Sequence, residues 1–395
     1  MNVAVLMSGD SPWSRQVVRG IAENGHRVTT VEVPDHPLSG IAPSDRLQES
    51  GEDPGDGTIQ RRSVRFGRRS IKGPGILRLA LTLRETVRKS GSEHLLTLYG
   101  GSFALAAWLS RVRPFAVYVV GSDVLFMRGF RRVLTRVALN AARAVFVNGE
   151  YLARKTRELA PRAPVIPLLM GIDTDRFSPV GKPPHPVRIV CTRAFKPVYD
   201  NERLIDALRL LEEWDGDYTV TFTSAGPLLE RARSAARERL SPEMLDRVEF
   251  LGGVSDDLLL DTVRKSHIYV SMSLSDGTST SLLEALSCGV FPVVSDIPQN
   301  REWIDPSIGN GLLFPLRDTE ALAEALRQSI SNPVMRERAA GPNRASVVER
   351  GCNRKKMKQL SEILFSGEFP DYPRRSTEEH DLLAKDGSSR RSPGC

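Results

Sequence analysis

Short apolar runs alternate with amphipathic stretches along most of this 395-residue chain. The apolar runs predict buried strands at residues 3–7, 26–33, 95–98, 116–120, 163–169, 187–191, 218–223, 248–251, 268–272 and 290–294. The amphipathic stretches predict helices, with clear examples at residues 76–87, 201–211, 321–330 and 347–365. Strands that alternate with helices are typical of α/β chains with parallel sheets, in which ligands bind at the carboxyl ends of the strands.

Prolines place the expected domain boundary near residue 180. The segment VGKPPHP, residues 180–186, holds three prolines in seven positions and is typical of a linker. The chain is also long enough for two domains, each with its own core. We therefore expect an N-terminal domain at 1–180, a C-terminal domain at 181–345, a crossover helix at 346–366 and a disordered tail at 367–395. Residues 34–60, rich in Pro and Gly, are expected to form a long loop.

The overall composition is that of a soluble globular protein, with 40% hydrophobic and 26% charged residues. The four cysteines show no metal-ligand spacing, so we expect reduced thiols and no zinc site. The first twelve residues lack the charged start and long apolar core of a signal peptide, and no stretch has eighteen uninterrupted apolar residues. We therefore expect a cytoplasmic protein without a membrane-spanning helix.

Positive charge is distributed unevenly along the chain, whose net charge is +7. Between residues 61 and 89, ten basic residues stand against the single acid Glu85. In a second cluster, arginines alternate with large apolar residues: Phe126, Arg128, Phe130, Arg131, Arg132, Val133, Leu134 and Arg136. Such a mixture suits peripheral contact with an anionic membrane, and a solvated arginine-rich surface is the structural alternative. Because no recognition motif accompanies the charge, no nucleic acid partner is expected.

Residues 275–301, SDGTSTSLLEALSCGVFPVVSDIPQNR, combine a small polar loop, a helix and a buried strand. A loop of small residues before a helix presents free backbone N–H groups and the positive end of the helix dipole, which suit a phosphate. Asp276 and Glu284 bracket this loop, and their carboxylates can accept hydrogen bonds from sugar hydroxyls. A structural alternative stays open, in which Ser281-x-x-Glu284 is a capping box and Asp276-Gly277 is an ordinary turn.

This stretch resembles the donor-site signature of the family 4 retaining glycosyltransferases, which have the GT-B fold. The signature is an acidic residue, seven further residues and a Glu, followed by a Pro-Val-Val strand and Ser-Asp. Asp276 stands where the family more often has Glu, so its side chain is one methylene shorter. The resemblance implies two Rossmann-like domains facing a cleft, with a C-terminal helix that crosses back to the N-terminal domain.

The resemblance extends to loops at strand ends in the N-terminal domain. Ser8 and Gly9 belong to the first such loop, which would face the donor phosphates or the acceptor. Tyr99 and Val120 stand where the family often has histidines. Asp123 is therefore the best ionisable candidate for catalysis beside the acceptor, and capping of the next helix is its structural alternative.

In the C-terminal domain, Arg193 and Lys196 lie beyond the first strand, where two cations are placed to neutralise a diphosphate. Arg193 matches the family's arginine, whereas Lys196 precedes the family's usual lysine position, and either could be a surface charge. Gly226 and Gly252 fall in segments that resemble donor-contacting loops. In full, the resemblance implies donor contacts from Ser8, Gly9, Gly226, Gly252, Gly277, Thr278, Ser279, Thr280, Ser281 and Glu284.

The activity implied by the resemblance is transfer of a glycosyl group from a nucleotide-diphosphate sugar, with retention at the anomeric carbon. The expected catalytic residues are Asp123, Arg193, Lys196 and Asp276. The two cations and the N–H groups of residues 278–281 would stabilise the leaving phosphates, and Asp276 would orient the transferred sugar. Glu284 would hold the ribose hydroxyls, and the leaving phosphate would take the acceptor proton.

No metal or cofactor is expected, because the Asp-x-Asp match Asp173-Thr174-Asp175 lies in the segment that closes the N-terminal domain. The basic N-terminal domain suggests a lipid-linked or cell-surface saccharide as acceptor. Two other classes stay open. A sugar epimerase or phosphorylase would need cleft histidines or a lysine-bound pyridoxal phosphate, and a non-catalytic carbohydrate- or nucleotide-binding scaffold fits the missing histidines.

Overall fold

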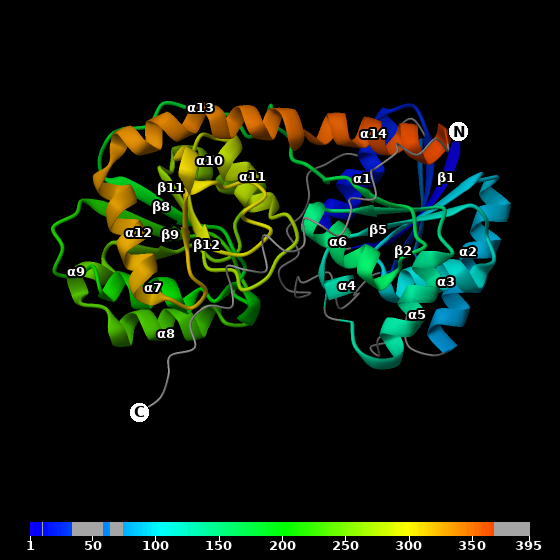
Figure 1. The fold of residues 1–395 in the computed structure, drawn as a ribbon, viewed down its shortest axis with the longest axis horizontal. Coiled ribbons are helices and arrows are strands. Elements are labelled where there is room, and N and C mark those ends of the chain that lie inside the picture. Colours follow the sequence, from blue (N-terminus) through cyan, green and yellow to red (C-terminus); the bar gives the residue numbers. More distant parts are fainter. Residues whose placement is uncertain (10, 34–57, 64–73, 126, 367–395) are drawn as a thin grey trace, which may run out of the picture.

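The computed structural model describes residues 1–9, 11–33, 58–63, 74–125 and 127–366, which form two α/β halves side by side (Figure 1). Each half is built around a parallel sheet with helices packed on its faces. The expected α/β class with two Rossmann-like domains is confirmed.

The N-terminal sheet has seven strands in the order β3-β2-β1-β4-β5-β6-β7. Their bounds are β1 Asn2–Ser8, β2 Arg27–Val33, β3 Ile59–Ser63, β4 His94–Leu98, β5 Phe115–Val119, β6 Ala144–Val147 and β7 Val165–Pro167. Its helices are α1 Pro12–Glu23, α2 Pro74–Ser90, α3 Gly101–Ser110, α4 Ser122–Leu125, α5 Gly129–Asn140 and α6 Glu150–Leu159. One core cluster joins the sheet to α2, α3, α5 and α6, and another joins it to α1 and the C-terminal helix.

Strand β3 corrects the expectation that residues 34–60 form a loop throughout. Ile59–Ser63 pairs in parallel with β2 at the edge of the sheet. Its sequence, IQRRS, has no apolar run because Gln60 and Arg61 are exposed there, and an edge strand needs little burial. Residues 34–57 and the predicted disordered tail, 367–395, lie outside the described residues.

The C-terminal sheet has six strands in the order β10-β9-β8-β11-β12-β13. Their bounds are β8 Val187–Cys191, β9 Tyr218–Phe222, β10 Val248–Phe250, β11 Ile268–Ser271, β12 Phe291–Ser295 and β13 Leu312–Phe314. The helices of this half are α7 Glu202–Arg209, α8 Leu229–Arg239, α9 Pro242–Leu245, α10 Asp256–Lys265, α11 Thr280–Ser287 and α12 Thr319–Ser331. The chain order reverses between β8 and β11, as it does between β1 and β4, so ligands are expected beside these strand ends.

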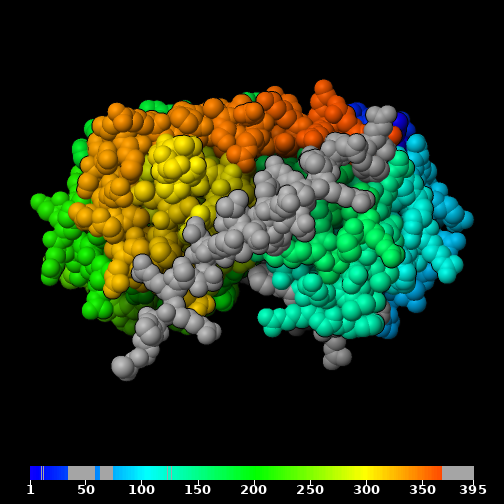
Figure 2. Space-filling model, in the orientation of Figure 1, coloured from blue at the N-terminus to red at the C-terminus, as the bar shows by residue number. Residues whose placement is uncertain are grey.

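Helices α13 (Pro333–Arg350) and α14 (Asn353–Ser366) run along one edge of both halves (Figure 2). The expectation of one continuous helix at 347–365 is wrong, because the chain breaks at Gly351 and Cys352. Cys352 pairs with Ile172 in an isolated parallel bridge where the chain crosses between the halves. Beyond the break, α14 buries Met357 and Leu360 in the N-terminal core, which confirms the predicted crossing back.

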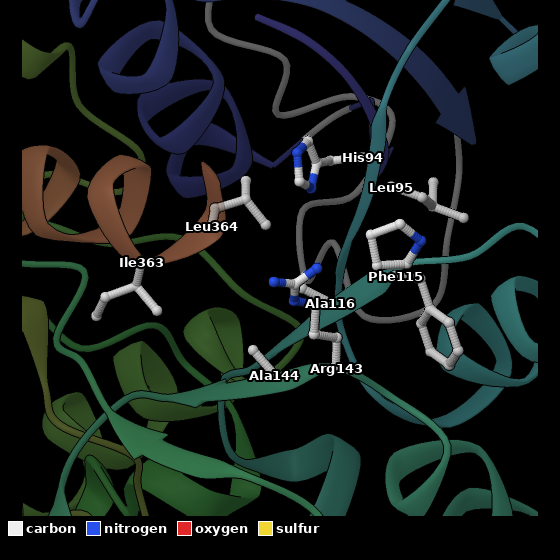
Figure 3. A pocket seen from close by; sticks show the side chains of 9 residues that line it. His94, Leu95, Phe115, Ala116, Arg143, Ala144, Ile363 and Leu364 are labelled. Carbon is white, nitrogen blue, oxygen red and sulfur yellow. The ribbon is translucent and has the colours of Figure 1, made fainter. Parts of the chain in front are cut away.

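A small pocket lies beneath α14, at the amino ends of the N-terminal strands (Figure 3). His94 and Ala144 begin β4 and β6, and Ile363 and Leu364 of α14 close the other side. The pocket therefore opens away from the carboxyl edge, where sites in such sheets lie. Among the described residues, no helix is long and apolar enough to cross a bilayer.

Candidate active site

The two strands at which the C-terminal sheet reverses its order each lead to a charged residue. Arg193 follows β8 and Asp276 follows β11. Their side chains meet, since Nη2 of Arg193 donates to Oδ2 of Asp276 at 2.5 Å. Burial disfavours the charge of Arg193, but the Asp276 carboxylate, acting together with Tyr199, Tyr269 and Cys191, outweighs this effect and raises the pKa of Arg193. Burial raises the pKa of Asp276, and Arg193 opposes that shift. The ion pair is thus held at the predicted position for a ligand.

The Arg193 guanidinium is held from two further directions. Its Nη1 donates to Oγ of Ser279 at 2.8 Å and to Oγ of Ser281 at 3.1 Å. Its central carbon lies 4.0 Å from the centre of the Tyr199 ring, within cation–π distance. The backbone is fixed as well, because Nδ2 of Asn201 donates to the Arg193 carbonyl at 3.0 Å. Sequence reasoning missed Tyr199 and Asn201, although both follow the same strand as Arg193.

Helix α11 is capped by Ser279, whose Oγ accepts the N–H of Leu282 at 3.3 Å. The capping-box alternative for Ser281 and Glu284 is therefore wrong, because the cap lies two residues earlier and Glu284 is the fifth residue of the helix. Within the part of the chain that the structure describes, the Glu284 carboxylate accepts no hydrogen bond. The backbone N–H groups of Thr280 and Ser281 likewise have no acceptor there. This helix start can therefore receive an anion.

Glu284 and Lys196 are partly buried ionisable groups near Arg193. Burial and the neighbouring Asp256 raise the pKa of Glu284 to about 7. Burial and the charge of Arg193 lower the pKa of Lys196, whose ammonium makes no ion pair with any described residue. A phosphate beside Lys196 and hydroxyl groups beside Glu284 would compensate the cost of burying these two charges.

Gly226, beyond the carboxyl end of β9, allows its loop to approach the backbone of Phe195 closely. Its φ is +151°, and a Cβ there would lie 2.6 Å from the carbonyl oxygen of Phe195. Only glycine therefore lets this loop pack against the segment that carries Arg193 and Lys196. Gly252 follows β10, one strand farther along the same sheet edge.

The loop around Gly277 contacts the N-terminal half. A Cβ on Gly277 would lie 2.5 Å from the Val120 carbonyl oxygen. Next to it, the Asn148 carbonyl accepts the N–H of Thr278 at 3.4 Å and its Oγ1–H at 3.3 Å, and Nδ2 of Asn148 donates to the Thr278 carbonyl at 3.2 Å. Asn148 follows β6, so the carboxyl edges of the two sheets meet at residues 276–281, the expected donor loop. Asn148 was not singled out, although its position after a strand was a usable signal.

Asp123 is 1% exposed and accepts three backbone N–H groups. Oδ2 accepts from Gly100 at 2.7 Å, and Oδ1 accepts from Gly121 at 2.8 Å and from Val120 at 3.2 Å. Burial raises the pKa of Asp123, and these N–H groups oppose the shift. The carboxylate ties together the loops after β4 and β5. The carboxylate does not cap the following helix, because all three N–H groups belong to residues that precede Asp123. Its catalytic role stays a prediction.

Ser8 and Gly9 lie at the carboxyl end of β1. Ser8 is fully buried, and the Gly9 N–H donates to the Val33 carbonyl at 3.2 Å. No hydrogen bond between described residues joins them to Arg193 or to the loop at 276–281. Their contact with a donor stays a prediction.

The literal Asp-x-Asp segment builds a turn. Oδ1 of Asp173 accepts the N–H groups of Asp175 and Arg176, both at 3.0 Å. Asp175 pairs with Arg354 of α14 at 2.8 Å. Among the described residues, no group of three or more His, Cys, Asp or Glu is arranged to hold a metal. Metal independence stays a prediction.

Comparison with known sequences gives matches to part of the chain. Residues 173–345 match the family described as Glycosyl transferases group 1. A phosphatidyl-myo-inositol mannosyltransferase from Mycobacterium leprae is 29% identical over 199 residues, which cover 48% of this chain and 51% of the relative. The match thus spans about half the length of that curated relative.

Solved structures match nearly the whole chain. Sucrose-phosphate synthase from Thermosynechococcus elongatus has a TM-score of 0.74 at 17% identity, covering 93% of this chain and 100% of its own. HepE from Anabaena, in complex with UDP, has a TM-score of 0.71 at 16% identity, with the same coverage. These likenesses confirm the GT-B fold that the sequence predicts.

Proposed function

We propose that this chain, whose residues 173–345 match the glycosyl transferases group 1 family within a GT-B fold, transfers a glycosyl group from a nucleotide-diphosphate sugar to an acceptor. The observation that carries the proposal is the set of anion-binding groups at the ends of β8 and β11. Arg193, Lys196 and the unbonded N–H groups at the start of α11 all lie there. UDP is a suitable first nucleotide to test, since HepE was solved with it.

The chemistry follows from where charge develops. Departure of the diphosphate leaves negative charge on phosphate oxygens while the sugar becomes oxocarbenium-like. Arg193, Lys196 and the N–H groups of α11 would stabilise that charge. A bound phosphate would share the Arg193 guanidinium with Asp276 or displace the carboxylate, which is then free to orient the sugar. Glu284, without a hydrogen bond from any described residue, would accept the ribose hydroxyls.

We further propose retention at the anomeric carbon and a metal-independent reaction. The family resemblance supports retention, and the cations at the β8 end supply the charge stabilisation that a metal gives elsewhere. The enclosure of Asp123 favours the leaving phosphate as the group that takes the acceptor proton. A strong general base facing the acceptor in a ternary complex would contradict this step.

Titration calorimetry with UDP, GDP, ADP and dTDP tests the proposal, with Glu284→Ala as the site variant. Glu324→Ala is the matched control, because Glu324 is exposed and, among the described residues, pairs only with Arg327 on its own helix. We expect one nucleotide to bind in the micromolar range, and the site variant alone to lose it. Release of that nucleotide from its sugar conjugates then measures turnover. Binding without turnover of any conjugate would favour the scaffold alternative.

The acceptor side offers a surface suited to a lipid-linked substrate. Helix α5 packs Ala138 and Leu139 into the core, yet Phe130, Val133 and Val137 are 74%, 54% and 40% exposed. The arginines of this segment are also exposed and make no ion pair with any described residue: Arg128, Arg131, Arg132 and Arg136. No acidic residue occurs in α5. We propose that this face contacts an anionic membrane, where apolar side chains insert and arginines meet lipid phosphates.

Vesicle sedimentation tests this contact. We expect binding to phosphatidylserine-containing vesicles that weakens with added salt, and loss of binding in Phe130→Ser/Val133→Ser. Leu210→Ser is the control, because Leu210 is 53% exposed in the other half of the molecule. Equal binding to neutral phosphatidylcholine vesicles would contradict the proposal.

A further inference from the structure

Glu302 caps a helix that belongs to the other half of the molecule. It lies in the turn after β12, and its carboxylate accepts the N–H groups of Glu150 and Tyr151 at 3.1 and 2.7 Å. These are the first two residues of α6. The helix has no side-chain cap of its own, because its N-cap residue is Gly149. A carboxylate is well suited to this end of the helix dipole.

The turn that carries Glu302 also holds the donor loop. Nε2 of Gln299 donates to the Asp276 carbonyl at 2.6 Å. On the other side, Nη2 of Arg350 donates to the Glu302 carbonyl at 2.9 Å, and the Arg350 guanidinium lies 4.3 Å from the Trp303 ring centre. Arg350 ends α13, directly before the chain crosses to the N-terminal half. This short turn therefore contacts the donor loop, the end of α13 before the chain crosses, and α6 of the N-terminal half.

We propose that Glu302 is a positioning residue, which couples closure of the two halves to the placement of the donor loop. The inference rests on the proposed glycosyl transfer for its catalytic consequence, but its structural consequence is independent of that activity. When the halves are together, Glu302 satisfies two N–H groups of α6, and Asn148 bonds Thr278 beside Asp276. When they separate, the α6 N–H groups lose their acceptor. The turn still bonds Asp276 through Gln299, but it is no longer held against the N-terminal half.

The size of the effect follows from the cost of removing a helix cap. Loss of a capping carboxylate at α6 should lower the ratio of closed to open molecules about tenfold. Glu302→Gln keeps one oxygen that accepts an N–H but loses the charge, so its effect should be intermediate. Glu324→Ala again serves as the control, since its partner Arg327 lies on the same helix.

Small-angle X-ray scattering of the full chain is the direct test. We expect the radius of gyration to increase in Glu302→Ala, to increase less in Glu302→Gln and to stay unchanged in Glu324→Ala. The thermal midpoint should change little, because each half keeps its own core. An unchanged radius of gyration in Glu302→Ala would overturn the inference, whatever the activity of the protein.

Kinetics then separate positioning from a purely structural role. We expect kcat in Glu302→Ala to fall about tenfold, with partial rescue in Glu302→Gln, while the Kd for the nucleotide alone changes less than twofold. An equal loss of nucleotide affinity would place Glu302 in the binding site and overturn the positioning role. Absence of turnover in the unmodified protein would contradict the proposed function and leave the scattering result standing.

Discussion

Arg193 and Asp276 form a buried ion pair across the reversal point of the C-terminal sheet, with Nη2 and Oδ2 2.5 Å apart. Replacing either residue by a neutral one should destabilise the folded protein, because its partner would remain buried without a counter-charge. The pair also explains how a guanidinium can stay in place before any phosphate arrives. Ser279 and Ser281 hold its other terminal nitrogen and Tyr199 covers its face, so the geometry proposed to bind a phosphate exists in advance.

Arg193→Met should reduce the free energy of unfolding by about 3 kcal/mol at pH 8, because the Asp276 carboxylate loses its partner. Burial already raises the pKa of Asp276, and loss of Arg193 removes the group that opposes this shift. At pH 5 the carboxyl can therefore take up a proton, and the destabilisation should be smaller. Urea unfolding at the two pH values measures the difference. Arg231→Met is the control, because Arg231 is 70% exposed in its pair with Glu202 and should cost less than about 1 kcal/mol. An equal loss at both pH values in Arg193→Met would contradict the argument.

Ser279 and Ser281 offer a matched pair of substitutions. Both hydroxyl oxygens accept from Nη1 of Arg193, but only Ser279 also caps α11 through the N–H of Leu282. Ser279→Ala should therefore be less stable than Ser281→Ala by about 1 kcal/mol, the usual cost of a lost cap. Urea denaturation of the two variants provides the comparison. Equal stabilities would show that the cap contributes nothing at this helix start.

Gly277→Ala tests how closely the two halves must approach. An added Cβ would lie 2.5 Å from the Val120 carbonyl oxygen, which is too close for any real contact. We expect kcat/KM to fall at least tenfold, since the donor loop must move away from the N-terminal half. Gly253→Ala is the control, because its Cβ would meet only the Ala225 Cβ at an ordinary 3.5 Å. Full activity in Gly277→Ala would mean that the contact at Val120 is not needed for the reaction.

The meeting of Arg193 and Asp276 at one edge of the C-terminal sheet could be predicted from the sequence. Arg193 and Asp276 could be placed together because each follows a buried apolar run, and parallel strands bring their carboxyl ends to one edge. Glu284 could be named from the family signature, but its freedom from capping could not, since the cap is decided by local backbone geometry at Ser279.

Contacts between the halves gave no sequence signal of this kind. Glu302 lies in a polar turn, and its partners on α6 depend on how the two sheets are placed relative to each other. The break between α13 and α14 was missed for the same reason, because Cys352 leaves the helix to pair with the distant Ile172. Hydrophobic periodicity indicates which face of a helix is buried, but it does not indicate where two distant chain segments cross.

Glu284 should make the stability of the protein depend on pH near neutrality. Burial and Asp256 raise its pKa to about 7 in the folded chain, whereas its ordinary value in an unfolded chain is about 4.3. The folded state therefore holds more protons than the unfolded state between these values, so the contribution of Glu284 to stability is present at low pH and is lost as the pH rises through 7. Glu284→Gln has no ionisable group and should be more stable than the unmodified protein at pH 8.5, by on the order of 2 kcal/mol.

Urea unfolding at pH 5 and pH 8.5 checks the sign of this effect. We expect the advantage of Glu284→Gln to fall by more than half between pH 8.5 and pH 5, where the folded carboxyl is protonated while the unfolded one is still mostly ionised. Glu249→Gln is the control, because Glu249 is exposed on the edge strand β10, and its substitution should matter little at either pH. An advantage of the same size at both pH values would mean that packing, rather than ionisation, separates Gln from Glu. The gain in stability should come with weaker nucleotide binding, because an amide replaces the carboxylate that would accept the ribose hydroxyls.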